Sequence, residues 1–170
     1  FANAQIWDAD GGRYRDEYAC YPVISLDFSG AARRGAAIAD VVRDALSGEC
    51  VRLLALLEAP DLARDKVRHI ERVARGAASE DEVASVLGVL IELLEMACDE
   101  QVVLLVDGYD AAWLGRASAR GASGADPAGL FDRVLFDAIA AARDSLRLTC
   151  LMGECPGPAD AALSSRGCSY

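Results

Sequence analysis

Residues 102–110, VVLLVDGYD, hold five consecutive apolar residues that run directly into an acidic turn containing glycine. The apolar run does not alternate with polar residues and is too short for a helix, so it predicts a fully buried strand of a parallel sheet. In open α/β sheets, ligands bind beyond the carboxyl ends of the strands. Asp107 and Asp110, which follow the run, are therefore the first candidate binding residues.

Two other short apolar runs, at 23–28 and 146–152, also predict buried strands, and the first ends near another carboxylate, Asp27. The segments between the runs carry apolar residues at helical spacing, and these predicted helices cover residues 31–47, 51–57, 61–75, 79–97 and 130–145. Short buried strands joined by helical crossovers pair in parallel with right-handed connections. The pattern predicts an α/β fold with a mostly parallel sheet.

Local signals set the expected boundaries of these elements. Ser47–Gly48 predicts the end of one helix, and Ser79, which precedes three acids, predicts the start of another. Residues 1–20 show no periodicity and are expected to form a loop with a turn at Gly11–Gly12. Residues 115–129, rich in glycine, are expected to form a flexible connection.

Composition narrows the class of protein. A chain of 170 residues fits one domain, residues 1–170. No apolar stretch reaches the roughly 18 to 20 residues of a membrane helix, so no membrane partner is expected. The net charge of −10 argues against direct nucleic-acid binding, because such binding rests on clustered Lys and Arg. The six cysteines show no C-x-x-C spacing, which favours reduced thiols and a cytoplasmic location.

Apolar residues that run into Asp107 match the Walker B pattern, in which a strand holds a carboxylate beside a magnesium ion that bridges nucleotide phosphates. The alternative is that Asp107 simply opens a turn, as polar residues do after many buried strands. Asp27 has the same two interpretations. It either shares a metal with Asp107 or caps the end of its own strand.

The remaining candidates have weaker patterns. His69 is the only histidine and lies in a highly charged segment, so we expect it on the solvated surface and not in a catalytic pair. Cys150 and Cys155 flank the end of the third predicted strand without further metal ligands at suitable spacing, and are expected to be a core thiol and a loop thiol. Trp113 is the aromatic residue nearest the acidic turn and is a candidate ligand contact.

Three blocks of the sequence resemble one family: YPVISLDFS at 21–29, LIELLEMACDEQVVLLVDGYDAAWL at 90–114 and LFDRVLFDAIAAARDSLRLTCLMGE at 130–154. In this order they are similar to the bacterial AAA-ATPase-like family, whose longer members carry a PD-(D/E)xK nuclease-like domain after the ATPase part. The resemblance covers roughly residues 1–155, with 1–20 as a lead-in, and the tail 156–170 matches poorly. It implies a P-loop NTPase fold, a three-layer sandwich around a mostly parallel sheet.

Position by position, the resemblance makes Asp107 the magnesium ligand and Asp110 the second acid of the nucleotide site. The family's water-orienting glutamate falls on Gly108, and its Thr-Gly sensor of the γ-phosphate falls on Met152–Gly153. The chain has no G-x-x-x-x-G-K-[ST] P-loop, and its only lysine is Lys66. The implied core therefore lacks its first strand and its P-loop, either because the chain was cut from something longer or because the protein lacks the unit.

These features predict a degenerate or truncated AAA-ATPase-like domain with a remnant magnesium and nucleotide site at Asp107 and little or no ATP hydrolysis by itself. No catalytic residue is assigned, and Mg²⁺ and ATP are expected as cofactors only of an intact parent. The alternative is a non-catalytic α/β interaction module that binds a protein partner or associates with itself. A third interpretation uses Asp27 and Asp107 as paired acids around magnesium in a small phosphotransfer or hydrolase fold.

Overall fold

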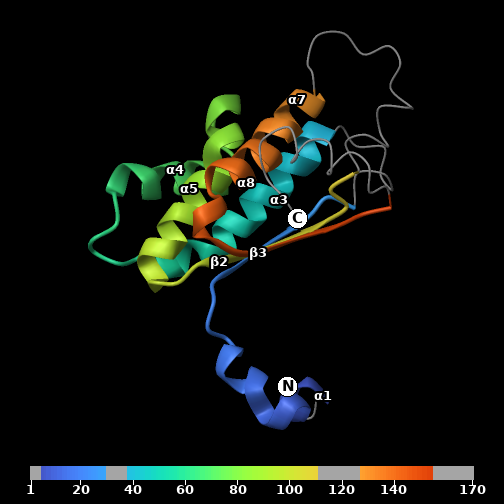
Figure 1. Cartoon of the computed structure of the whole chain (residues 1–170). Helices are drawn as coiled ribbons and strands as arrows, with labels where there is room; N and C mark the ends of the chain where they lie inside the picture. The colour runs from blue at the N-terminus through green and yellow to red at the C-terminus, as the bar shows by residue number, and fades with distance from the viewer. Residues whose placement is uncertain (1–4, 30–37, 111–126, 155–170) are drawn as a thin grey trace.

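A computed structural model describes residues 5–29, 38–110 and 127–154. The centre of the described fold is a sheet of three strands in the order β1 (Val23–Asp27), β2 (Val102–Asp107) and β3 (Leu146–Met152). Both pairings are parallel, and β2 lies between the other two strands (Figure 1). The three predicted strands, their parallel direction and the α/β class are confirmed.

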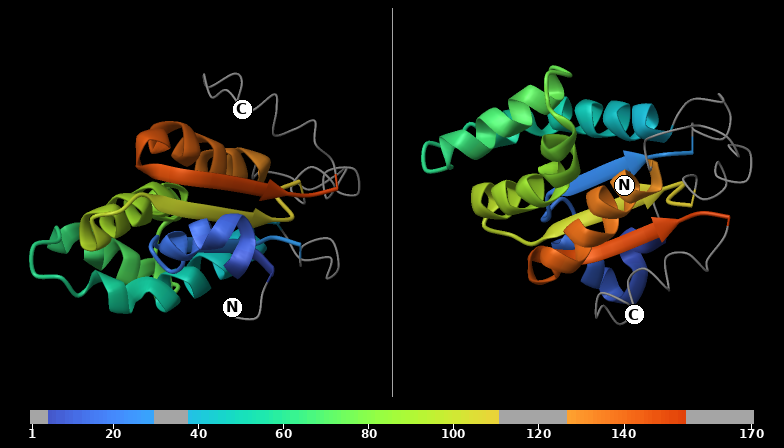
Figure 2. Two further views of the ribbon diagram at one scale, coloured as in Figure 1. Left: turned by 60° about the horizontal axis from the view of Figure 1, so that its bottom comes forward. Right: turned by 90° about the horizontal axis from the view of Figure 1, so that it is seen from above.

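Helices pack against one face of this sheet (Figures 1 and 2). Alternate strand residues, such as Ile24, Leu104 and Val106, are buried beneath them and form the core with the apolar faces of the helices. None of the described helices is long and apolar enough to cross a membrane. The helices are α3 (Ile38–Leu53), α4 (Arg64–Ala74), α5 (Glu80–Cys98), α7 (Pro127–Asp132) and α8 (Ala138–Ala141).

These helices leave the opposite face of the sheet uncovered, and we call it the bare face. The strand register sets three rows of side chains on this face. The first row, at the amino end, is Val23, Val103 and Leu148, and the middle row is Ser25, Leu105 and Cys150. The last row, at the carboxyl end, is Asp27, Asp107 and Met152. Val23, Leu148 and Met152 are 36%, 53% and 44% exposed. Parallel sheets are normally covered on both faces. The predicted three-layer sandwich needs a layer here, whereas the described residues form two layers.

α3 runs straight through the predicted stop at Ser47–Gly48, so the prediction of two separate helices is wrong. The helix continues to Leu53 and passes directly into a 3-10 turn, η2 (Leu54–Leu57). The extra turn buries Glu49, Cys50 and Leu53. This burial outweighs the roughly 1 kcal/mol that a glycine costs in a helix interior.

The crossover from β2 to β3 ends in an irregular helix. A π turn, η3 (Arg133–Asp137), joins α7 to α8, and a 3-10 turn, η4 (Arg143–Ser145), leads into β3. The predicted helix before the third strand is confirmed in place but is less regular than expected. The ring of Phe131 lies 5.0 Å from that of Phe28 and 6.2 Å from that of Phe136, so edge-to-face contacts anchor the crossover beside the end of β1.

α5 begins at the predicted cap. The hydroxyl of Ser79 accepts a hydrogen bond from the N–H of Glu82 at 3.3 Å, and the Glu82 carboxylate accepts one from the N–H of Ser79 at 2.9 Å. These two bonds complete a capping box. The bond from the Ser79 N–H, assisted by Arg72, lowers the pKa of Glu82.

Replacing Ser79 with alanine is expected to lower the free energy of unfolding by about 1 kcal/mol, because the first turn of α5 loses its side-chain acceptor. Ser85→Ala is the matched control, since the Ser85 hydroxyl donates to the Asp81 carbonyl at 2.9 Å and caps nothing. Urea unfolding followed by circular dichroism measures both variants. Equal losses from the two substitutions would contradict the cap.

The beginning of the chain, predicted to be a loop, contains helical turns. α1 (Gln5–Asp8) passes into a 3-10 helix, η1 (Ala9–Glu17), and the two together are called the N-terminal arm below. Gly11 and Gly12 have φ angles of 71° and 85° and mark a kink, which agrees with the predicted turn. The loop assignment is therefore wrong, although its turn signal was correctly located.

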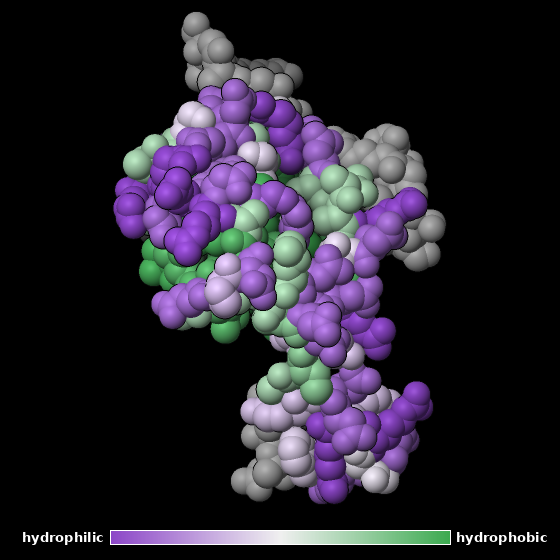
Figure 3. All heavy atoms as spheres, turned by 90° about the vertical axis from the view of Figure 1, so that its left-hand side faces the viewer, coloured by the Kyte–Doolittle hydropathy of each residue, from purple (hydrophilic) through white to green (hydrophobic). Residues whose placement is uncertain are grey.

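The N-terminal arm packs mainly on itself. The guanidinium of Arg15 lies 5.6 Å from the centre of the Trp7 ring, and this ring packs edge-on against Tyr18 at 5.8 Å. No residue of η1 is buried. The arm lies on the side of the bare face, opposite the helices, and a narrow neck joins it to the body (Figures 1 and 3).

Candidate functional site

The carboxyl ends of β1 and β2 bring two predicted site residues side by side. Asp27 and Asp107 are register partners and lie in the same row of the bare face. The N–H of Phe28 donates to the Asp107 carbonyl at 2.8 Å, which extends the pairing past the strand ends. The Asp107 side chain is exposed, and no described residue forms a hydrogen bond or ion pair with its carboxylate.

Asp27 has a local hydrogen bond. Its Oδ1 accepts from the N–H of Ser29 at 2.8 Å. This is the strand-end cap that stood as the alternative to a shared metal. Of the two carboxylates in this row, Asp107 is thus the one that points an unengaged acceptor at solvent.

Gly108 stands where the resemblance predicts a glutamate, and the backbone leaves no room there for a side chain. Its φ angle is 67°, in the left-handed region that favours glycine. A Cβ atom on Gly108 would lie 2.5 Å from the backbone nitrogen of Ser29 and 2.9 Å from the carbonyl carbon of Phe28. The Gly108 N–H also donates to the Met152 carbonyl at 2.8 Å, so the turn contacts both neighbouring chain segments.

Asp110 lies inside the protein and not at the open edge. It is 2% exposed, and its Oδ2 accepts a hydrogen bond from the N–H of Glu154 at 2.8 Å. A Cβ atom on Gly153 would lie 2.6 Å from Oδ1 of Asp110 and 2.7 Å from the Tyr109 ring, so the close approach requires glycine. Asp110 therefore ties the turn after β2 to the turn after β3, a structural role beside its predicted contact with nucleotide.

The carboxylates at this edge could supply some, but not all, of the ligands of a magnesium ion. Among the residues that the structure describes, no three His, Cys, Asp or Glu side chains lie close enough together to hold a metal ion. Magnesium is usually bound through one or two carboxylates, with water and substrate phosphates filling the other positions. Asp107 fits the role of one such carboxylate, with Asp27 next to it.

Other sequence candidates lie away from this edge or outside the described residues. His69 is half-buried, and its Nε2 lies 2.7 Å from the carbonyl oxygen of Glu82, which joins α4 to α5. Cys150 lies in the middle row of the bare face and is half-buried. Trp113 and Cys155 are not among the described residues.

The described cysteines are free thiols. Burial raises the pKa of Cys50 to about 12, with a smaller contribution from the neighbouring carboxylate of Glu49. Cys50 therefore stays protonated at neutral pH and packs as a small apolar side chain.

The outer edge of β1 holds an ion pair between a buried glutamate and a half-exposed arginine that the sequence did not predict, which we call the Glu49–Arg52 clasp. Glu49 is 6% exposed, and its Oε1 accepts from the Ser25 N–H at 2.6 Å. Arg52 donates to Oε2 of Glu49 at 2.8 Å and to the Val23 carbonyl at 2.5 Å. The bond to Glu49 raises the pKa of Arg52. Two backbone groups that β1 would offer another strand are thus already bonded.

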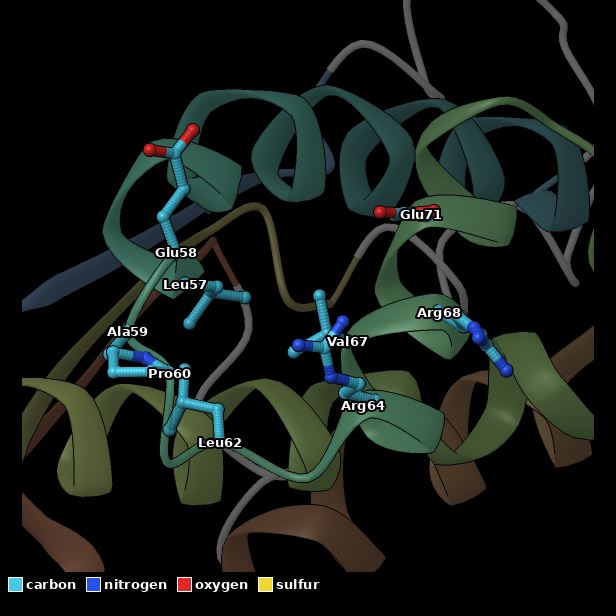
Figure 4. Close-up of a pocket in the computed structure, with 9 residues that line it drawn as sticks. All are labelled: Leu57, Glu58, Ala59, Pro60, Leu62, Arg64, Val67, Arg68 and Glu71. Atoms are coloured by element: carbon cyan, nitrogen blue, oxygen red, sulfur yellow. The ribbon is translucent and has the colours of Figure 1, made fainter.

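A cavity of about 210 Å³ lies between η2 and α4 (Figure 4). Leu57 and Leu62 supply apolar lining, and Glu58 and Arg64 bring charges of both signs. It shares no residue with the carboxyl edge, and its mixed lining favours no class of ligand.

Comparison with protein-family models, with curated proteins and with solved structures gave no match. The resemblance to the AAA-ATPase-like family accordingly remains a prediction from the sequence blocks.

Proposed function

We propose that this chain is a catalytically inactive core of the AAA-ATPase-like type, in which Asp107 keeps the position of a magnesium ligand. By itself it hydrolyses little or no ATP. In this proposal β1, β2 and β3 are three strands of an incomplete P-loop NTPase sheet. The parallel order and the exposed Asp107 at the carboxyl end of the middle strand support this assignment.

The observation that carries the proposal is the turn at Gly108. Hydrolysis of a phosphoanhydride needs a residue that orients the attacking water. The backbone of Phe28 and Ser29 fills the space that a side chain at position 108 would need. The chain therefore holds the carboxylate for a metal but has no place beside it for the water-orienting group.

Magnesium and nucleotide phosphates would meet the protein at Asp107. A bound magnesium ion supplies neutralisation of phosphate charge. The protein contributes one exposed carboxylate from a rigid strand end, and the sequence has no glycine-rich loop with a lysine to hold the triphosphate. Weak binding without turnover is the expected behaviour.

Titration of the full chain with Mg-ATP is expected to give weak binding and no phosphate release above that of buffer. Asp107→Asn should weaken magnesium binding without changing the unfolding midpoint, because the side chain is exposed and unpaired among the described residues. Asp144→Asn is the matched control, since its side chain is 95% exposed and lies before β3, away from the carboxyl edge. Isothermal titration calorimetry and a phosphate-release assay measure these effects.

Tight binding followed by steady phosphate release would overturn the proposal. An Asp107→Asn variant that binds magnesium with the same affinity as the parent would show that Asp107 is not a magnesium ligand. A phosphotransfer or hydrolase activity based on Asp27 and Asp107 would appear in the same assays as turnover that Asp107→Asn abolishes.

The second candidate function is a non-catalytic α/β interaction module. The bare face favours it, because three of its apolar side chains are 36% to 53% exposed on a sheet of a type that is normally covered.

A further inference from the structure

We infer that a second copy of this chain covers the bare face, with the two sheets packed face to face about a two-fold axis that runs across the strands. The inference rests on the second proposed function, the interaction module, and names its partner. It starts from the exposed side chains of Val23 and Leu148, on either side of half-buried Val103, and from Met152 at the other end of the face. Sheets that pack face to face interdigitate side chains of this kind.

The β1 edge of the sheet is protected against strand addition, whereas the bare face is not covered by a helix layer. The Glu49–Arg52 clasp closes the outer edge of β1. On β3, Arg147 is an extra residue between Leu146 and Leu148 in the pairing with β2, so the amino end of this strand carries a bulge. Bulges and charges are the usual devices that prevent pairing at an edge. A partner is therefore expected on the face and not at the edge of β1.

The charges of the sheet are complementary under the proposed two-fold axis. At the amino end, the guanidinium of Arg147 lies 5.4 Å from the centre of the Tyr21 ring and has no ion pair within the described residues. At the carboxyl end, Asp107 also forms no ion pair with another described residue. An axis across the strands places the amino end of one sheet over the carboxyl end of the other. Arg147 of each copy then approaches Asp107 of the second copy.

The N-terminal arm supplies the area that the face alone lacks. Three strands about 4.8 Å apart, with five residues of about 3.3 Å each, cover only about 240 Å². A stable dimer buries about 800 Å² on each partner. The arm stands on the side of the bare face, and η1 contains no buried residue (Figure 3). Because the arm stands in front of the bare face in Figures 1 and 2, a second copy that covers this face also contacts the arm.

Sedimentation velocity and light scattering of the full chain test the inference. We expect a mass twice the 18.0 kDa of one chain. Leu148→Glu should give a folded monomer, because Leu148 is already 53% exposed in one copy and a charge there is buried only on association. Met96→Glu, on α5 and 55% exposed, is the matched control and should remain dimeric.

A charge exchange tests the proposed axis. Arg147→Asp should raise the dissociation constant at least about tenfold, since it places two acids together, and adding Asp107→Arg should recover most of the loss. Hydrogen exchange should show residues 5–17 protected in the parent and unprotected in Leu148→Glu. Circular dichroism of each variant confirms that it is folded.

A parent chain that stays monomeric at high concentration would overturn the inference, and the bare face would then belong to another chain or to the arm of the same copy. A dimer that survives Leu148→Glu, or that Arg147→Asp leaves unchanged, would overturn it as well. None of these outcomes bears on ATP hydrolysis. The proposed inactive ATPase core is tested by phosphate release from the monomeric Leu148→Glu variant, in which no second copy covers Asp107.

Discussion

Replacing Gly108 with glutamate is expected to destabilise the protein by about 3 kcal/mol or more and to restore no ATP hydrolysis. The glutamate would match the family's pattern. It would also place a Cβ atom 2.5 Å from the backbone nitrogen of Ser29, at a φ angle of 67°. The strain of the backbone and the overlap with Ser29 act together, because neither segment can move without breaking the pairing of β1 with β2.

Gly108→Ala isolates this effect with the smallest side chain, and Gly88→Ala is its control. Gly88 lies within α5, and a Cβ atom there would meet nothing within 4 Å. Gly88→Ala should therefore stabilise the protein by about 1 kcal/mol, because alanine favours the helix. Urea unfolding of the three variants gives the comparison. A Gly108→Glu protein that is as stable as the parent and releases phosphate from ATP would contradict this prediction, because the turn at position 108 would then have room for a side chain.

The second large effect is expected at the Glu49–Arg52 clasp. Glu49→Ala should lower the free energy of unfolding by about 2 kcal/mol, because it leaves the part-buried Ser25 N–H without its acceptor and removes the hydrogen bonds of the half-exposed Arg52 to the carboxylate. Glu92→Ala is the matched control. Its ion pair with Lys66 is on the surface, with the Glu92 side chain 47% exposed, so its loss should cost less than about 1 kcal/mol.

Glu49→Ala should also aggregate faster than Glu92→Ala at equal fractions of folded protein, since it reopens the edge of β1 to other strands. Turbidity during incubation below the unfolding midpoint measures this. If the two variants lose equal stability and aggregate equally, the clasp has no special role at the edge.

Much of the sheet was predictable because its signals are local. The runs that became β1, β2 and β3 are short, apolar and bounded by polar residues, and the cap at Ser79 lies within three residues of its partner. Parallel pairing followed from the helices between the strands. Such features depend on near neighbours in the chain, which the sequence shows directly.

The errors arose where distant contacts decide the outcome. Glycine at position 48 normally ends a helix, yet the burial of Cys50 and Leu53 carries α3 onward. The sequence presented Gly108 as a missing glutamate, whereas the reason for glycine is the backbone of Ser29, far away in the chain. The clasp was missed because Glu49 and Arg52 look like an ordinary surface pair until their contacts with β1 are known.

Within the candidate site, the sequence predicted only the strand that carries Asp107 and the position of Asp107 at its end. Asp107 was correctly placed at the carboxyl end of β2, in register with Asp27. The burial of Asp110 was not predictable, since it depends on how closely the turns after β2 and β3 approach. The bare face was also unforeseen, because an uninterrupted apolar strand suggests cover on both sides.

Asp107 and Leu148 belong to the same side of the sheet, and this shared position links two equilibria. In the proposed dimer, the second copy that shields Leu148 from water also closes the approach to the Asp107 carboxylate, so the proposed magnesium ion and the second copy compete for one surface. By thermodynamic reciprocity, each then weakens the affinity for the other by the same factor. The protein's own concentration would thereby set how readily its acidic strand end takes up a cation.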